Sequence, residues 1–155
     1  MNRRGFLVAG MCVAVVGDAQ SAPSDIARLI DGYVNAVRRD AGIQQLRPAH
    51  RLTGAAARFA DVLAAGNRLD HGADGRTLGQ RARAEGYPYR RLAENLAQHS
   101  TDLNDDQLAR QLVSLWLGSP GHRKNILDGG LLETGIGVSA GHGSIFAVQV
   151  FGLRA

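Results

Sequence analysis

The sequence predicts an α+β fold in which helices pack on an antiparallel sheet. Three or four segments between residues 24 and 118 carry apolar residues at helical spacing. Two β-rich runs, TGIGVSAG and SIFAVQVFG, follow near the C-terminus and are joined around AGHGS, as expected of an antiparallel hairpin. A chain that separates its helices from its strands in this way is typical of the α+β class.

The first two helices are predicted from the spacing of their apolar residues. Over residues 24–42 these recur at helical spacing, with Ser24 placed to cap the helix and Gly42 to end it. Pro48 is expected to open a second helix, because proline is favoured in a first helical turn. The apolar face of that helix, within residues 52–63, is rich in alanine, so another element can approach it closely.

The middle of the chain predicts a loop and a short helix. Glycines and aspartates over residues 66–77 indicate a loop, and Thr77 is placed to cap a helix that ends at Gly86. The pattern of residues 89–98, YRRLAENLAQ, fits a strand or a helix and does not decide between them.

A longer helix is predicted over residues 104–118. Its early acids suit the positive end of the helix dipole. Its apolar stripe consists of Leu108, Leu112, Leu115 and Trp116. Ser119 then fits a turn and cap residue, with Pro120 in the first position of another short helix.

The N-terminal segment has the features of an export signal. Arg3 and Arg4 precede the apolar stretch GFLVAGMCVAVVG, which is short for a membrane span, and small residues place a cleavage site after Ser21. RRGFL resembles the twin-arginine motif, and an ordinary secretory signal fits as well. We therefore expect residues 1–21 to be removed, residues 22–155 to form a single domain, and the protein to be secreted, periplasmic or extracellular.

Composition limits the classes of partner. The net charge is +4, and the arginines are interleaved with acids, so no nucleic-acid site is predicted. No second long apolar segment follows the signal, so no stable membrane insertion is predicted. The single cysteine, Cys12, lies within the expected signal, which leaves the mature domain without an internal disulfide. The sequence does not indicate an oligomeric state.

Two of the five histidines are candidates for a functional site. His50, His99 and His142 lie in polar or turn segments and are expected to be solvated. His71 and His122 differ from these because each stands in a glycine-bearing turn beside an apolar element. Turns on a rigid scaffold are where binding and catalytic residues gather.

Glu94 is the third candidate, because it lies in the apolar run AENLA. A carboxylate is costly to bury without a partner, and the alternative is that Glu94 lies on the exposed face of a strand. Two imidazoles and a carboxylate could hold zinc or another divalent cation. They could equally form a buried hydrogen-bonded cluster in which a histidine titrates, and the spacing does not decide between these.

No other catalytic motif is present. Ser119 stands near His122, but no G-x-S-x-G elbow surrounds it. The sequence also lacks a phosphate-binding loop, a dinucleotide fingerprint and zinc-finger spacing. No activated nucleophile is therefore predicted.

Four segments occur together in a recognisable order and spacing: AENLA at 93–97, SLWLGSPGHRKNIL at 114–127, ETGIGVS at 133–139 and FAVQVFG at 146–152. Taken together they resemble the CAP superfamily in its bacterial form. Members of this superfamily are SCP-like extracellular domains, related to pathogenesis-related proteins, venom allergens and cysteine-rich secretory proteins. The resemblance extends over nearly all of residues 26–152.

The resemblance implies an α–β–α sandwich, with an antiparallel sheet between helical layers, and a central cavity lined by two histidines and two acids. By matching motifs, His122, Glu94 and His71 take three of these positions. The fourth departs from the pattern. The glutamate found five residues after the first histidine is replaced by Arg76, and Asp74 is the nearest carboxylate.

The ligand-binding residues implied for this cavity are His71, Asp74, Glu94, Asn95, His122 and Asn125. Of these, His71 and His122 are the candidate metal ligands, with zinc or another divalent cation as the candidate cofactor. Which residue would be catalytic, if catalysis occurs, is left unknown by the sequence.

The expected function is a secreted CAP-domain protein that binds a small ligand, a metal ion or a cell-envelope component through this cavity. The expected partner is a small apolar ligand or an envelope component. The alternative is a secreted hydrolase, a peptidase or cell-wall amidase, in which Glu94 or a histidine activates water. A third possibility makes the cluster a polar brace between the helices and the sheet.

Overall fold

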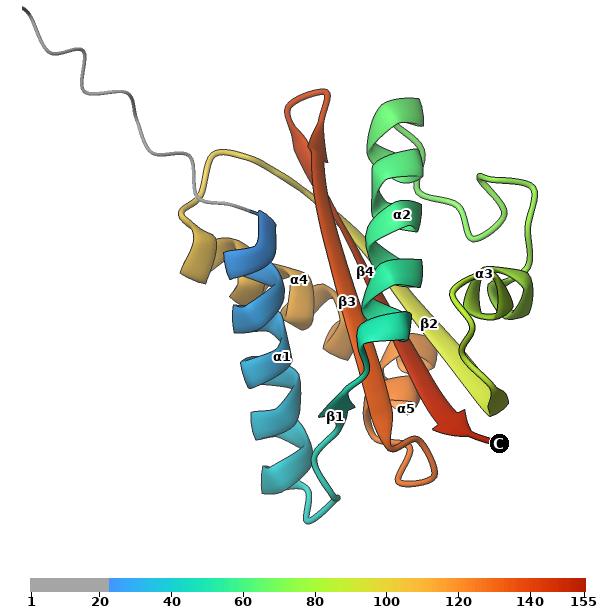
Figure 1. Cartoon of the computed structure of the whole chain (residues 1–155). Coiled ribbons are helices and arrows are strands. Elements are labelled where there is room, and N and C mark those ends of the chain that lie inside the picture. The colour runs from blue at the N-terminus through green and yellow to red at the C-terminus, as the bar shows by residue number, and fades with distance from the viewer. Residues whose placement is uncertain (1–22) are drawn as a thin grey trace, which may run out of the picture.

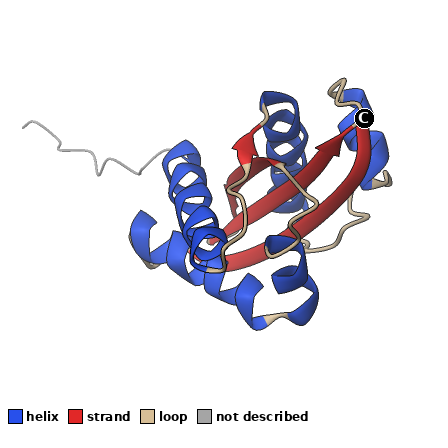
Figure 2. Ribbon diagram, turned by 90° about the horizontal axis from the view of Figure 1, so that it is seen from below, coloured by secondary structure: helices blue, strands red, loops and turns tan. Residues whose placement is uncertain are grey.

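A four-stranded sheet divides the helices of this protein into two layers (Figures 1 and 2). The computed structural model describes residues 23–155. The predicted export signal and the capping role of the Ser24 side chain lie outside the described part. The elements, in chain order, are α1 Pro23–Asp40, β1 Arg47–Pro48, α2 His50–Gly66, α3 Leu78–Ala84, β2 Tyr89–Ser100, α4 Asp105–Gly118, α5 Pro120–Ile126, β3 Glu133–Gly141 and β4 Ser144–Arg154.

The predicted α–β–α sandwich is confirmed. One core cluster joins α1, α4 and α5 to one face of the sheet, and a second joins α2 and α3 to the other face. Strand β4 serves both clusters, because successive side chains point to opposite faces. Phe146, Val148 and Val150 pack with α2, whereas Ala147 and Phe151 pack in the cluster of α1 and α4.

The strands are ordered β1-β3-β4-β2. Strands β3 and β4 form the predicted antiparallel hairpin, and His142 and Gly143 at its tip both have positive φ, as a two-residue turn of this kind requires. The segment of undecided pattern is strand β2, which pairs with β4 and lies at the sheet edge. The sheet is not wholly antiparallel, because the short β1 pairs with β3 in parallel.

The prediction that Pro48 opens the second helix is wrong. Pro48 lies in β1, and α2 begins two residues later at His50. The backbone amides of Arg47 and Ala49 on either side of Pro48 donate to carbonyls of Leu132 and Thr134. An edge strand tolerates proline because only alternate residues need to donate.

The alanine-rich face of α2 packs directly on glycines of β3, as its small side chains predict. A methyl group at Gly135 would overlap the backbone of Leu52, and one at Gly137 would overlap the backbone of Ala56. Glycine at these two positions therefore lets the helix lie against the strand backbone, which fixes α2 on the sheet.

Two details of the predicted helices also need correction. Leu115 does not belong to the buried stripe of α4, since it is 49% exposed while Leu112 and Trp116 are fully buried. Ser119 occupies the cap position of α5 with Pro120 in its first turn, but the Ser119 side chain makes no capping hydrogen bond. Thr77, in contrast, caps α3 as predicted, in a reciprocal pair with Gln80.

Candidate functional site

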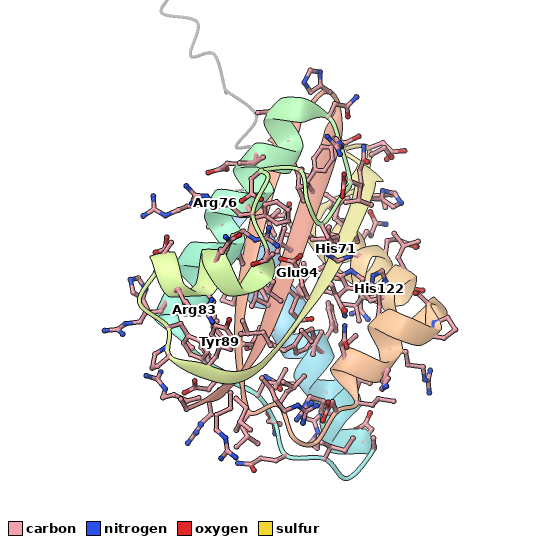
Figure 3. All side chains as sticks on the ribbon, turned by 90° about the vertical axis from the view of Figure 1, so that its right-hand side faces the viewer. His71, Arg76, Arg83, Tyr89, Glu94 and His122 are labelled. Atoms are coloured by element: carbon pink, nitrogen blue, oxygen red, sulfur yellow. The ribbon has the colours of Figure 1, made fainter. Side chains whose placement is uncertain are left out.

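The three principal candidates, His71, Glu94 and His122, lie close together at the edge of the sheet (Figure 3). His71 lies in the loop between α2 and α3, Glu94 in the middle of β2, and His122 in the first turn of α5. The loop and α5 lie on opposite faces of the sheet. They can meet because β2 is an edge strand with no neighbour beyond it among the described residues.

Glu94 is buried and fully paired, so its placement on an exposed strand face is excluded. Its side chain is 3% exposed. Its Oε1 lies 2.8 Å from His71 Nδ1. The Nη2 group of Arg81 donates to both carboxylate oxygens, at 2.9 Å to Oε1 and 2.8 Å to Oε2. The carboxylate is thus held by a guanidinium and an imidazole together.

Arg81 is the site residue that sequence reasoning missed. Its side chain is 5% exposed, and its Nη1 donates to the carbonyls of His71 and Arg76, each at 3.1 Å. The guanidinium carbon lies 3.6 Å from the centroid of the Phe59 ring. The sequence does contain an indication that Arg81 is buried. It stands three residues after Leu78 and directly before the buried Ala82, on the inner face of α3.

Asp74 belongs to the same cluster, on the other side of Arg81. Its Oδ1 accepts from Arg81 Nη1 at 3.1 Å and from the backbone amide of Arg76 at 3.0 Å. The carboxylate implied as the fourth member of the cavity is therefore paired with Arg81. We call Asp74, Arg81, Glu94 and His71 the arginine cluster.

His122 is half-buried and faces a different environment. Burial lowers the pKa of its imidazole below the ordinary value of 6.5, and the nearby charge of His71 lowers it further. At neutral pH the ring is therefore uncharged. Its neighbour His71 is the exposed member of the pair, with 58% of the side chain accessible.

Asn95 and Asn125 attach α5 to the strand. Alternation along β2 directs the Asn95 side chain to the face opposite Glu94, where it donates to the His122 carbonyl at 3.1 Å. Asn125 donates to Asn95 Oδ1 at 2.9 Å. These bonds hold the first turn of α5, and with it His122, against β2. A direct contact of either amide with a ligand stays a prediction.

The residues present do not fit a resident zinc ion. Among residues 23–155 no group of three or more histidine, cysteine, aspartate or glutamate side chains is arranged to hold a metal. Structural zinc sites use about four protein ligands and catalytic ones about three. Here the Glu94 side chain is 3% exposed and paired with Arg81 and His71, so His71 and His122 would supply two ligands without a carboxylate.

The two candidate histidines are accessible to different degrees, His71 being exposed and His122 partly buried. Two pockets in the described part of the chain are lined by other residues than His71, Glu94 and His122. The first shares Asp74 and Arg81 with the arginine cluster and has a volume of about 280 Å³. The arrangement thus offers an imidazole pair at the surface, held from behind by a buried ion-pair network. None of the helices within residues 23–155 is long and apolar enough to cross a membrane.

A sheet between two helical layers, with histidines from a loop and a short helix meeting across its edge strand, defines a domain of the extracellular SCP type. The chain belongs to the CAP family, described as the cysteine-rich secretory protein family, whose model matches residues 32–151. The match leaves out the predicted signal and contains no cysteine.

Solved structures of the same fold come from bacteria and animals. An outer surface protein from Borrelia burgdorferi is 18% identical with a TM-score of 0.77, over 87% of this chain and 97% of that one. An extracellular SCP-domain protein from Bacillus anthracis is 24% identical with a TM-score of 0.69, over 86% of this chain and 41% of that one. NaASP2, solved with Zn²⁺, is 14% identical with a TM-score of 0.59, over 88% of this chain and 82% of that one. No curated protein matches this sequence.

Proposed function

We propose that this protein is an exported CAP domain that binds a hydroxyl- or amide-bearing component of the cell envelope at the surface formed by His71 and His122. Export is supported by the expected signal over residues 1–21 and by the extracellular and outer-surface proteins that share the fold. Binding without catalysis is supported by the burial and pairing of Glu94, whose carboxylate is held behind Arg81 and His71.

The hydrogen bond between His71 and Glu94 carries the proposal, because it sets which atom His71 presents. A carboxylate only accepts, so His71 Nδ1 carries a proton, and whenever the ring is neutral its Nε2 is an acceptor. The neutral ring of His122 adds a second uncharged polar group beside it. Such a pair suits a ligand that offers hydroxyl or amide donors, as the glycan and peptide parts of a cell wall do.

Binding should be measured by isothermal titration calorimetry with a purified disaccharide–peptide fragment of cell wall as the probe. We expect His71→Ala with His122→Ala to weaken binding at least about tenfold, the equivalent of one hydrogen-bonding group lost. The matched control is His142→Ala, which removes an exposed histidine at the hairpin tip. Equal affinity in the wild type and the double variant, or no binding by the wild type, would refute the proposal.

The hydrolase alternative is favoured by one observation. His71 and Glu94 have the geometry of a general base and the carboxylate that orients it, with 2.8 Å between Nδ1 and Oε1. In that case Glu94 would orient the base and His71 would activate water. The test is whether the pure protein releases peptide or glycan fragments from cell wall. Release that is lost in His71→Ala and retained in His142→Ala would show that the function is hydrolysis and not binding alone.

A further inference from the structure

The pocket beside the arginine cluster is lined partly by apolar side chains, of which Val62 is exposed whereas Phe59 lies under the guanidinium of Arg81. It lies between α2 and the segment formed by the following loop and α3, with a volume of about 280 Å³. Ala55, Phe59 and Val62 of α2 and Ala84 of α3 supply apolar lining. Val62 is one of the few large apolar side chains left exposed in the described chain. Exposed apolar surface inside a concave site is typical of ligand pockets.

The charges around this pocket leave one cation without a partner. The two acids that line it are already paired, Glu85 with Arg58 at 2.6 Å and Asp74 with Arg81 at 3.1 Å. The Arg76 guanidinium, which also lines the pocket, makes no hydrogen bond or ion pair with any residue from 23 to 155. Arg76 uses only its backbone amide and carbonyl, towards Asp74 and Arg81. Among the described side chains that line the pocket, Arg76 is therefore the cation without a paired carboxylate.

This pocket is separate from the histidine surface. In Figure 3, Arg76 and His122 lie on opposite sides of Glu94. Arg81 stands between the two, since it lines the pocket and also donates to Glu94. A ligand in the pocket would contact Arg76 and the apolar residues of α2 without touching either imidazole.

We infer that this pocket binds a small monocarboxylate with a compact apolar body, whose carboxylate pairs with Arg76. A guanidinium binds a carboxylate through two parallel N–H donors, which gives it a preference for this group over a neutral amide. A water-sized group occupies about 30 Å³, so the pocket has room for about nine or ten non-hydrogen atoms.

Phenylacetate, with about ten non-hydrogen atoms, is a suitable probe, and phenylacetamide is its neutral counterpart of nearly the same shape. Binding should be followed by two-dimensional NMR of the whole domain. We expect phenylacetate to shift the resonances of residues 58–62 and 74–85, and to bind about tenfold more tightly than phenylacetamide. Equal affinity for the two probes would overturn the assignment of the carboxylate to Arg76.

Variants separate this site from the fold and from the histidine surface. Arg76→Gln should lower the affinity for phenylacetate about tenfold. Arg39→Gln, a control on an exposed arginine of α1, should leave it unchanged. Val62→Asp should abolish binding, whereas Leu115→Asp, at an exposed leucine of α4, should not. The His71→Ala, His122→Ala variant should bind phenylacetate normally, and shifts confined to the histidines would overturn the inference.

Discussion

Replacement of Arg81 by methionine is the most direct test of the arginine cluster. Methionine keeps an unbranched apolar chain over Phe59 but removes the guanidinium that donates to Glu94 and Asp74. Glu94 would remain 3% exposed with only His71 as a partner. Breaking a buried ion pair from one side costs about 3–5 kcal/mol, against about 5–15 kcal/mol for the unfolding of a whole domain. We therefore expect Arg81→Met to lose about 3–5 kcal/mol of stability.

Urea denaturation followed by tryptophan fluorescence is a suitable assay, because Trp116 is the only tryptophan and is fully buried. The matched control is Arg83→Met on the same helix. Arg83 is exposed and stacks over Tyr89 at 4.9 Å, so its loss should cost less than about 1 kcal/mol. A loss below about 1 kcal/mol for Arg81→Met would refute the buried-pair account.

A double variant keeps the test valid if Arg81→Met does not fold. Arg81→Met with Glu94→Leu removes both charges, and replacing a buried ion pair by apolar groups is often close to neutral. We expect the double variant to be more stable than Arg81→Met by about 2 kcal/mol or more. A double variant less stable than Arg81→Met would show that the charge left on Glu94 is not the cause of the loss.

Four further predictions rest on the described contacts and burial. Gly137→Ala should cost about 3 kcal/mol or more, because its methyl would overlap the backbone of α2. Gly32 is exposed in the middle of α1, so Gly32→Ala should instead raise the free energy of unfolding by about 0.5–1 kcal/mol. Urea denaturation measures both glycine variants. Arg38→Met should cost about 3 kcal/mol or more, since the fully buried guanidinium donates to four backbone carbonyls; retained stability would contradict this. His122 should titrate below 6.5 by NMR, and His71→Ala should raise its pKa only in part, because burial is the larger cause; a value at or above 6.5 in the wild type would contradict the burial.

The sign of the His122 effect on stability also follows. The pKa of His122 in the folded protein lies below its ordinary value, so the unfolded chain binds the proton more readily. The contribution of His122 is therefore fully present above about pH 6.5 and is lost as the pH falls towards the folded pKa. His122→Ala should make stability less dependent on pH in this window.

The fold could largely be predicted from the sequence because its patterns are local. Helical spacing located α1 and α4, the cap residue Thr77 located α3, and the β-rich runs around AGHGS located the hairpin. What failed depends on contacts distant in sequence. Pro48 is a favourable first helical residue, but hydrogen bonds from its neighbours to the chain at residues 132–134 hold it in an edge strand. The parallel pairing of β1 has no signature in two residues.

The site was predicted in part for the same reason. The motif resemblance indicated His71, Glu94 and His122, and these lie close together. Arg81, the partner of Glu94, was not predicted, because an arginine on a short helix is usually solvated. Only its helical spacing from Leu78 and its position beside Ala82 indicate that it is buried. The sequence shows that Arg76 stands where the family has a glutamate. It does not show that Arg81 pairs with Asp74.

Arg81 also determines which chemistry this surface can support. A carboxylate that serves as a metal ligand or as a general base must be reached by the metal or by water, and the Glu94 side chain is 3% exposed behind its partners Arg81 and His71. Glu94 can therefore act on a ligand only through His71, by fixing the proton on Nδ1. Binding at the surface and hydrolysis by His71 both remain compatible with this constraint, whereas direct activation of water by Glu94 does not. The nitrogen that can contact a ligand at this site is therefore Nε2 of His71, on the exposed side of the ring. Titration with a ligand tests whether that nitrogen is accessible.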